Sequence, residues 1–203
     1  MANTVQLILA SGSEARKTMM QAAGLTFDVV PADIDEDAIR ASMMLESGTV
    51  EAADVASVLA MEKAMLVSRA HPKALVIGSD QVLALGRRHF TKSATEVEAR
   101  ETLVALRGRT HELVSAVALA HGGEIVWQSF DSAQMTMRQF SDDYIASYIS
   151  SAGDAVVKSV GCYELEGFGV QLFEGIEGDY FTILGMPLLP LLTELRTRGV
   201  VMS

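Results

Sequence analysis

The sequence predicts a mixed α/β (α+β) fold, in which an elongated, twisted mixed sheet is flanked by helices. Short apolar runs alternate with helical patterns in the first half of the chain, and the second half carries strand-like segments around a Gly-Gly turn. The chain has 203 residues, of which 49% are hydrophobic, so it can bury a substantial core. We therefore expect residues 1–203 to form one domain with two lobes.

The first half of the chain predicts buried strands that are each followed by a helix. The run Val5–Ala10 is apolar except for Gln6, which is typical of a strand buried on both faces. Asp80 falls near the end of the third predicted strand, where ligands commonly bind in α/β sheets. After the first strand, the predicted segments are a helix over 14–23, a strand over 25–31, an acidic segment from 32, a helix over 50–70, a strand over 73–82, a loop over 86–93 and a helix over 95–108.

The second half predicts antiparallel strands and shorter helices. A Gly-Gly pair separates two strand-like segments, which is typical of a β-hairpin or meander. Ser141 is placed to cap one helix, and Pro187 is placed to open the last. The predicted segments are strands over 111–120 and 125–137, a helix over 142–151, loops and short strands over 160–178, and a helix over 188–199.

Composition excludes several classes of partner. The formal net charge of −10 argues against a general affinity for nucleic acid, because that binding requires many phosphates to be neutralised. No window reaches 18 apolar residues, and the first residues lack the pattern of a signal peptide, so we expect neither a membrane partner nor export. The sequence contains one cysteine, Cys162, so no internal disulfide can form and the cytoplasm is the expected compartment.

The turn after the first strand combines small hydroxyl residues with positive charge. Ser11, Gly12 and Ser13 follow the apolar run, and Arg16 and Lys17 come next. Backbone N–H groups in such a turn, with cations behind them, suit a phosphate group. The same residues are also typical of an ordinary helix start, with Ser11 or Ser13 as the N-cap. The turn alone leaves both interpretations open.

Further charged residues stand in apolar surroundings or in loops. Asp80 follows an apolar strand, where an unpaired charge is costly, and this favours a functional role. Lys63 interrupts the apolar face of the predicted long helix, and Lys92 lies in a loop. The run Asp33–Asp37 is more typical of a solvated helix start than of a metal site. If Asp80 is a general base toward water, we expect a divalent cation, Mg²⁺ or Mn²⁺, because an ordinary aspartate is a weak base.

Several common signatures are missing. The sequence has neither a G-x-x-x-x-G-K-[ST] loop nor a G-x-G-x-x-G motif after a strand, which argues against a P-loop NTPase and a dinucleotide enzyme. Its four histidines show no H-E-x-x-H pattern, and one cysteine cannot form a zinc-site spacing. We expect His111 to be structural.

Seven blocks of sequence together resemble a known family. They are, in order, LILASGSEARK, FDVVPADIDE, LAMEKA, VIGSDQV, LRGRTHELVSAVAL, GCYELEGFG and IEGDYFTILGMPLLPL. Their order and spacing from Leu7 to Gly199 are similar to those of the Maf family of nucleoside triphosphate pyrophosphatases. The resemblance implies a cytoplasmic homodimer with a central cleft, similar in fold to the inosine triphosphate pyrophosphatases. It also implies a divalent metal and cleavage between the α and β phosphates, which gives a monophosphate and pyrophosphate.

The resemblance also assigns roles by position. Asp80 takes the place of the proton acceptor, and Glu36 falls on an acidic position near the metal, so these two residues are the implied metal ligands. The phosphate-contacting positions are occupied by Ser11, Arg16, Lys63 and Lys92. The chain departs from the family pattern S-x-S-P-R-R, since Glu14 and Ala15 replace the proline and the first arginine. We expect Lys17 to replace part of the lost positive charge, without the bidentate geometry of arginine.

Gln81 and Glu166 predict which base is bound. SDQV together with EGFG resembles the branch that acts on 7-methyl-GTP, whereas the uridine and thymidine branch carries D-T-V and a glutamine before the late glycine. One carboxylate can accept both donors of the guanine edge, and a 7-methylated purine is cationic, so we expect Glu166 to read this base. Two alternatives stay open: a broad-specificity house-cleaning pyrophosphatase, or a catalytically weakened nucleotide-binding regulator of cell division.

Overall fold

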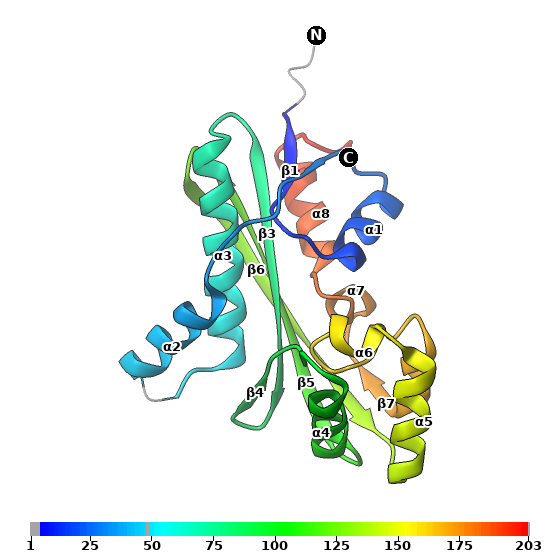
Figure 1. The fold of residues 1–203 in the computed structure, drawn as a ribbon. Coiled ribbons are helices and arrows are strands. Elements are labelled where there is room, and N and C mark those ends of the chain that lie inside the picture. Colours follow the sequence, from blue (N-terminus) through cyan, green and yellow to red (C-terminus); the bar gives the residue numbers. More distant parts are fainter. Residues whose placement is uncertain (1–4, 48, 203) are drawn as a thin grey trace. The chain divides into compact units, whose positions relative to one another are not determined.

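A computed structural model describes residues 5–47 and 49–202 of the chain. The strands are β1 (Leu7–Leu9), β2 (Asp28–Val29), β3 (Leu75–Leu85), β4 (Arg88–Phe90), β5 (Thr110–His121), β6 (Glu124–Met137) and β7 (Phe173–Glu177). The helices are α1 (Glu14–Ala22), α2 (Glu36–Ser47), α3 (Ala52–Ala70), α4 (Glu96–Leu106), α5 (Asp142–Ala152), α6 (Ala155–Lys158), α7 (Tyr180–Ile183), α8 (Leu188–Thr197) and the 3₁₀-helix η1 (Phe168–Leu172). These elements confirm the predicted mixed α/β class (Figure 1).

The strands of the described residues form one seven-stranded sheet of mixed direction. Its order is β2-β1-β3-β5-β6-β7, and β4 pairs with β3 outside this path. The pairs β1–β2 and β1–β3 are parallel, whereas β3–β4 and β6–β7 are antiparallel. Gly122 and Gly123 separate β5 from β6, and both have positive φ angles, as the predicted hairpin turn requires.

The chain divides into two compact units, and each is described by itself. The first unit takes in the chain up to Gln81, the segment Val114–Asp131 and the chain from Asp179 onward. The second takes in Val82–Leu113 and Ser132–Gly178. The predicted cleft between two lobes, and the prediction of a single domain over 1–203, stay predictions.

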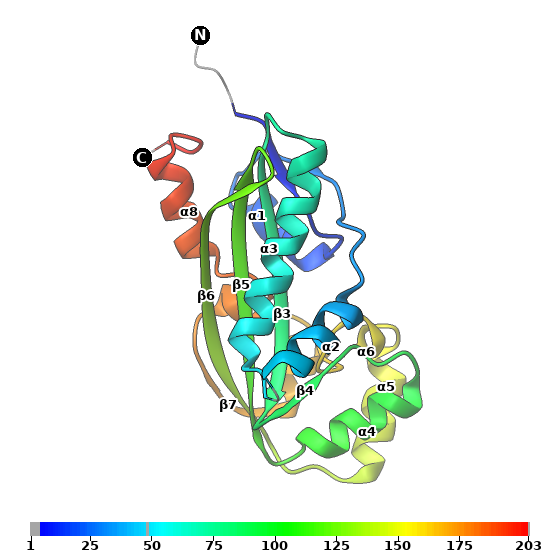
Figure 2. The ribbon, with the colours of Figure 1, turned by 90° about the vertical axis from the view of Figure 1, so that its left-hand side faces the viewer.

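In the first unit, helices cover both faces of the sheet. Figures 1 and 2 show α3 along one face and α1 and α8 on the other. Side chains of β1 alternate accordingly: Leu7 and Leu9 pack in a cluster with residues of α1 and α8, whereas Ile8 packs with Val67 of α3. All three β1 side chains are buried, so burial on both faces is confirmed, but the strand is shorter than the predicted run over 5–10, whose first two residues are exposed.

The absence of a side chain at Gly78 lets α3 approach β3 closely. A Cβ atom added at this position would lie 2.7 Å from the backbone nitrogen of Ala64 and would also overlap the carbonyl oxygen of Ala60. Both contacts are with the backbone or the packed face of α3, which cannot move aside like a flexible side chain. This close approach positions two functional side chains, since Lys63 lies on α3 and Asp80 lies two residues after the glycine.

The second unit is packed around helices α4, α5 and α6 and a group of aromatic rings. Ser141 caps α5 as predicted, since its hydroxyl accepts a hydrogen bond of 3.1 Å from the N–H of Tyr144. His111 is buried, and its Nε2 lies 2.7 Å from the hydroxyl of Tyr163. Burial lowers the pKa of His111 to about 4. The side chain is therefore uncharged at neutral pH, as a structural histidine should be.

The structure corrects several predicted boundaries. The strand predicted over 25–31 is reduced to β2, whose two residues are exposed at the edge of the sheet. The strand predicted over 73–82 continues to Leu85, because Val82 and Leu83 are also buried and β4 pairs with its last residues. Asp80 therefore lies in the middle of β3 and not near its end. The loop predicted over 86–93 contains β4, and helices α6 and α7 and the 3₁₀-helix η1 were not predicted. Of α2, only the start was anticipated, in the acidic run Asp33–Asp37.

None of the helices in the described part of the chain is both long enough and apolar enough to cross a lipid bilayer.

The substitution Gly78→Ala should lower the free energy of unfolding by about 1–3 kcal/mol, because the added methyl group overpacks the contact between β3 and α3. Chemical denaturation would measure the change. Gly175→Ala is the matched control, since its Cβ would meet Thr136 at an ordinary 3.5 Å. Equal stabilities of the two variants would contradict the close packing at Gly78.

Candidate active site

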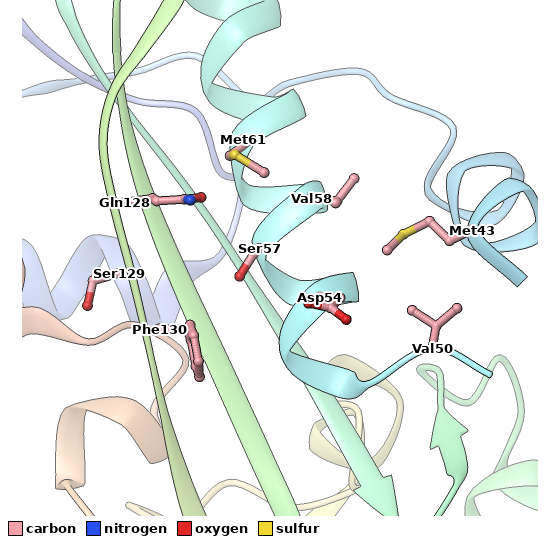
Figure 3. Close-up of a pocket in the computed structure, with 9 residues that line it drawn as sticks. All are labelled: Met43, Val50, Asp54, Ser57, Val58, Met61, Gln128, Ser129 and Phe130. Atoms are coloured by element: carbon pink, nitrogen blue, oxygen red, sulfur yellow. The ribbon is translucent and has the colours of Figure 1, made fainter. Parts of the chain in front are cut away.

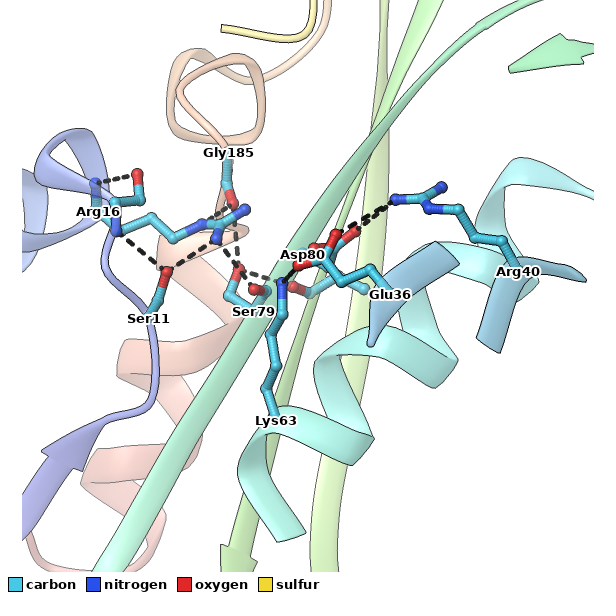
Figure 4. Close-up of polar contacts among 10 residues, drawn as sticks. Ser11, Arg16, Glu36, Arg40, Lys63, Ser79, Asp80 and Gly185 are labelled. Carbon is cyan, nitrogen blue, oxygen red and sulfur yellow. Dashed lines mark hydrogen bonds and ion pairs between the residues drawn. The ribbon is translucent and has the colours of Figure 1, made fainter. Parts of the chain in front are cut away.

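Arg16 is the cation that follows the first strand, and its side chain turns into the first unit. Its Nε donates to the carbonyl oxygen of Gly185 at 2.8 Å, and its Nη1 donates to Ser11 Oγ at 3.0 Å and to the carbonyl oxygen of Ser79 at 2.9 Å (Figure 4). Ser13 caps α1, because its hydroxyl accepts from the N–H of Arg16. The segment is therefore both an N-capped helix and the support of a buried cation.

Burial lowers the pKa of the Arg16 guanidinium, and the negative charges of Asp80 and Glu36 offset part of this effect. An arginine side chain nevertheless keeps its proton in proteins. Arg16 is thus a fixed positive charge, held by one hydroxyl and two main-chain carbonyl groups. Of these contacts, only the one with Ser11 lies close in sequence.

Lys63 bridges two carboxylates from different elements. Its Nζ lies 2.6 Å from Asp80 Oδ1 and 2.6 Å from Glu36 Oε1. Lys63 projects from α3, Asp80 from β3 and Glu36 from the first turn of α2. Lys63 and Asp80 are buried, whereas Glu36 is partly exposed. The structure therefore brings together three of the residues that the sequence predicted.

Arg40 completes this group of charges from the next turn of α2. Its Nη2 lies 3.6 Å from Asp80 Oδ2 and 3.8 Å from Glu36 Oε2 (Figure 4). These are ion-pair distances, longer than those of hydrogen bonds. We call Glu36, Arg40, Lys63 and Asp80 the carboxylate cluster. Its two positive and two negative side chains balance one another, and the charge of Arg16 comes in addition.

The pKa of Glu36 reflects this surrounding charge. Partial burial alone would raise it, but the hydrogen bond from Lys63 and the positive charges of Lys63, Arg40 and Arg16 lower it below its ordinary value. Glu36 therefore remains ionised at neutral pH. The stabilisation that it contributes is present above the ordinary pKa of glutamate and is lost as the pH falls through the lowered value.

Two buried polar atoms of the carboxylate cluster have no hydrogen-bond partner. They are Asp80 Oδ2, an acceptor, and Arg40 Nη1, a donor. A buried polar group without a partner costs about 1–3 kcal/mol, so such atoms are uncommon away from functional sites. A ligand that offers both a donor or cation and a negatively charged oxygen would satisfy both atoms. Metal-assisted binding of a phosphate has this chemistry.

The donor set of the carboxylate cluster fits a divalent cation that is shared with a substrate. The described residues contain no group of three or more His, Cys, Asp or Glu side chains able to hold a metal ion on their own. Mg²⁺, however, is commonly bound by one or two carboxylates together with water and substrate phosphates. Asp80, with its unpartnered Oδ2, and Glu36 supply two such carboxylates. A metal cofactor stays a prediction.

Gln81 follows Asp80 and connects β3 with the segment around α7. Its Nε2 lies within hydrogen-bond distance of Ser115 Oγ and of the carbonyl oxygens of Thr182 and Ile183, at 3.0–3.1 Å. Ser115 in turn donates to the carbonyl oxygen of Thr182 at 2.7 Å. The amide nitrogen of Gln81 is therefore occupied by protein acceptors. Its predicted role in base specificity stays a prediction.

Three other residues were predicted to bind the substrate: Lys17, Lys92 and Glu166. None of them takes part in these contacts. Lys17 is partly exposed and pairs with Glu14 at 3.5 Å, so it does not share the acceptors of Arg16. Lys92 and Glu166 are exposed residues of the second unit. Their predicted roles in phosphate and base binding stay predictions.

The acidic run Asp33–Asp37, which leads into the first turn of α2, contains two kinds of residue. Asp33, Asp35 and Asp37 are exposed, and Asp35 accepts a hydrogen bond of 2.9 Å from the N–H of Ala38. These three fit the interpretation as a solvated helix start. Glu36 is the exception, because it faces Lys63.

Sequence reasoning missed three contributors to the site. Arg40 could have been found, since it stands four residues after Glu36 on what proves to be one helix face. Ser79 Oγ donates to the carbonyl oxygens of Ala116 and Gly185, at 2.8 Å and 3.1 Å. Gly185 acts through its carbonyl oxygen and adopts a φ of +108°, which favours glycine. Main-chain acceptors leave no sequence signal.

A pocket of about 660 Å³ lies elsewhere in the first unit, among α2, α3 and β6 (Figure 3). None of the predicted site residues lines it. Its walls are formed by Met43, Val50, Asp54, Ser57, Val58, Met61, Gln128, Ser129 and Phe130.

Comparisons with known proteins match nearly the whole chain. The family model described as Maf-like protein matches residues 6–198. A nucleoside triphosphate pyrophosphatase of Bradyrhizobium diazoefficiens is 52% identical over 195 residues, which is 96% of this chain and 95% of the relative. A 7-methyl-GTP pyrophosphatase of Mesorhizobium japonicum is 50% identical over 198 residues, which is 98% of each chain.

Among solved structures, a nucleoside-triphosphatase, also described as a dITP/XTP pyrophosphatase, from Mycobacterium abscessus is 15% identical and has a TM-score of 0.39. The match covers 97% of this chain and 96% of that chain.

The substitution Lys63→Met should lower the free energy of unfolding at neutral pH by about 3 kcal/mol, because it leaves the buried carboxylate of Asp80 without its hydrogen-bonded cation. The double variant Lys63→Met, Asp80→Asn should recover part of this loss, since it removes the unpaired charge. Urea denaturation of both variants measures the difference. A double variant less stable than the single one would contradict the pairing.

Proposed function

The chain belongs to the Maf family, and on this premise we propose that it hydrolyses nucleoside triphosphates to a nucleoside monophosphate and pyrophosphate. The observation that carries the proposal is the carboxylate cluster, in which buried Asp80 keeps one oxygen without a hydrogen-bond partner beside two cations. The names of the two rhizobial relatives describe the same class of reaction.

Asp80 acts as the proton acceptor in this reaction. Lys63 holds Oδ1 at 2.6 Å, which fixes the orientation of the carboxylate, and Oδ2, which has no hydrogen-bond donor in the protein, accepts a proton from water. The water oxygen then attacks the α phosphorus as the proton passes to Asp80. The bond between the α phosphorus and the bridging oxygen breaks, and pyrophosphate leaves with the electron pair. Lys63 remains beside the carboxylate and stabilises its negative charge while it is ionised.

The cations of the first unit bind the phosphate groups. Two unit charges about 4 Å apart interact by roughly 4 kcal/mol at an effective dielectric constant near 20. Arg16, Lys63 and Arg40 together carry one positive charge more than the carboxylates of Glu36 and Asp80, and this excess attracts a triphosphate locally despite a formal net charge of −10 for the whole chain. Ser11 adds a hydroxyl beside Arg16. The family resemblance assigns Lys92 to phosphate binding as well, and Lys17 is expected to replace lost positive charge there; both roles stay predictions.

Glu36 and Asp80 are the residues that would hold a divalent cation, Mg²⁺ or Mn²⁺. When bound, such an ion lowers the pKa of water and neutralises phosphate charge. The unpartnered Asp80 Oδ2 supports this assignment, because it is a buried acceptor that no protein donor satisfies.

The proposed substrate is 7-methyl-GTP. Support comes from Glu166, whose carboxylate can accept the two donors of the guanine edge and favours a cationic base. The Mesorhizobium relative is named for this substrate, whereas the Bradyrhizobium relative carries the broader name. A broad-specificity pyrophosphatase is therefore the second candidate. We further propose that the chain acts in the cytoplasm as a homodimer.

Purified chain incubated with Mg²⁺ and a panel of nucleoside triphosphates should release pyrophosphate and not orthophosphate. Asp80→Asn should reduce kcat by at least about 100-fold, because it removes the proton acceptor. Asp33→Asn is the matched control, since it removes an exposed carboxylate from the acidic run. Orthophosphate as the product, or full activity of Asp80→Asn, would contradict the proposed reaction.

Glu166→Gln should lower the ratio of kcat/KM for 7-methyl-GTP to that for UTP by about tenfold or more, since an amide cannot accept both guanine donors. Glu164→Gln, a change at a nearby exposed glutamate, should leave the ratio unchanged. An unaltered preference in Glu166→Gln would remove this residue from base recognition and favour broad specificity.

A further inference from the structure

Arg40 covers the side of the two carboxylates that Lys63 leaves open. Lys63 contacts Oδ1 of Asp80 and Oε1 of Glu36, whereas Arg40 Nη2 faces Oδ2 of Asp80 and Oε2 of Glu36. In each of the two carboxylates, one oxygen therefore faces Lys63 and the other faces Arg40 (Figure 4). Any further cation bound by both carboxylates would compete with Arg40 for these oxygens.

Arg40 is held loosely by comparison with Arg16. Arg16 makes three hydrogen bonds of 2.8–3.0 Å, all to protein acceptors. Arg40 approaches its carboxylates only to 3.6 Å and 3.8 Å, and its Nη1 is buried without a hydrogen-bond partner. Charge attraction thus holds Arg40 in place without directional bonds. Its side chain is 20% exposed, which leaves it a path toward solvent.

We propose that Arg40 is an internal counter-cation, which occupies the carboxylate pair in the ligand-free chain and leaves it when a divalent cation binds. The released guanidinium then donates to a phosphate oxygen of the substrate, which gives Nη1 the acceptor that it lacks in the protein. Its position one helical turn after Glu36 keeps it beside the site after it moves. The phosphate half of this inference rests on the proposed reaction, whereas the competition rests only on the proposed assignment of Glu36 and Asp80 as metal ligands.

Titration of the nucleotide-free chain with Mn²⁺, followed by the loss of the electron paramagnetic resonance signal of the free ion, tests the competition. Arg40→Gln should bind Mn²⁺ about tenfold more tightly than the unmodified chain, because the competing charge is gone. Arg40→Lys keeps the charge and should bind Mn²⁺ within about twofold of the unmodified chain. Arg196→Gln removes an exposed arginine of the same unit and controls for net charge.

Two outcomes would overturn the competition: Mn²⁺ affinity of Arg40→Gln no higher than that of Arg196→Gln, or equally tight binding by the Lys and Gln variants. Glutamine is a good helix former, and Arg40→Lys provides a second variant if the first fails to fold. Thermal unfolding of each variant verifies that it is folded.

Calorimetric titration with inorganic pyrophosphate at saturating Mg²⁺ tests the phosphate half. Arg40→Gln should bind pyrophosphate about tenfold more weakly than the unmodified chain, the opposite direction to its effect on Mn²⁺. Unchanged pyrophosphate affinity would overturn this half. A chain that binds Mn²⁺ as expected but releases no pyrophosphate from nucleotides would overturn the proposed function and leave the competition standing.

Discussion

The placement of Lys63 between Asp80 and Glu36 is the interaction on which the site depends. It joins α3, β3 and α2, three elements whose functional residues are separated by 17 to 44 positions in the sequence. A buried lysine and a buried aspartate are each unfavourable alone, and each is tolerated because the other is within 2.6 Å. Gly78 lets α3 pack closely on β3 two residues before Asp80, so core packing and charge pairing occur at the same contact between these two elements.

The other half of the site depends on main-chain groups. The carbonyl oxygen of Gly185 accepts from Arg16 and from Ser79, and the carbonyl oxygens of Thr182 and Ile183 lie against the amide of Gln81. The segment that contains α7 thus orients side chains from α1 and β3. Arg16 is fixed by these contacts, whereas Arg40 has none of comparable geometry. The site combines one rigid cation with one that is free to change partners.

The sequence predicted most of the fold and part of the site, for identifiable reasons. The continuous apolar run of β1 and the cap of α5 are local patterns, and both predictions are confirmed. The predicted end of the third strand was wrong. The basic residues after Leu85 resemble a loop in the sequence, but they form β4, which pairs with the last residues of β3. Arg40 was missed because the acidic run before it suggested a solvated helix start. Glu36 and Lys63 were assigned by resemblance, since spacing alone cannot show that two distant residues meet.

The backbone contacts of Gly185 have a consequence for how the molecule tolerates change over evolution. Amino-acid replacements near a carbonyl acceptor leave that carbonyl group in the chain. The identity of the residues near α7 is therefore less constrained than the position of their backbone. An insertion or deletion in this segment would displace three carbonyl groups at once and release both Arg16 and Gln81. We therefore expect this segment to tolerate amino-acid replacements but not insertions or deletions.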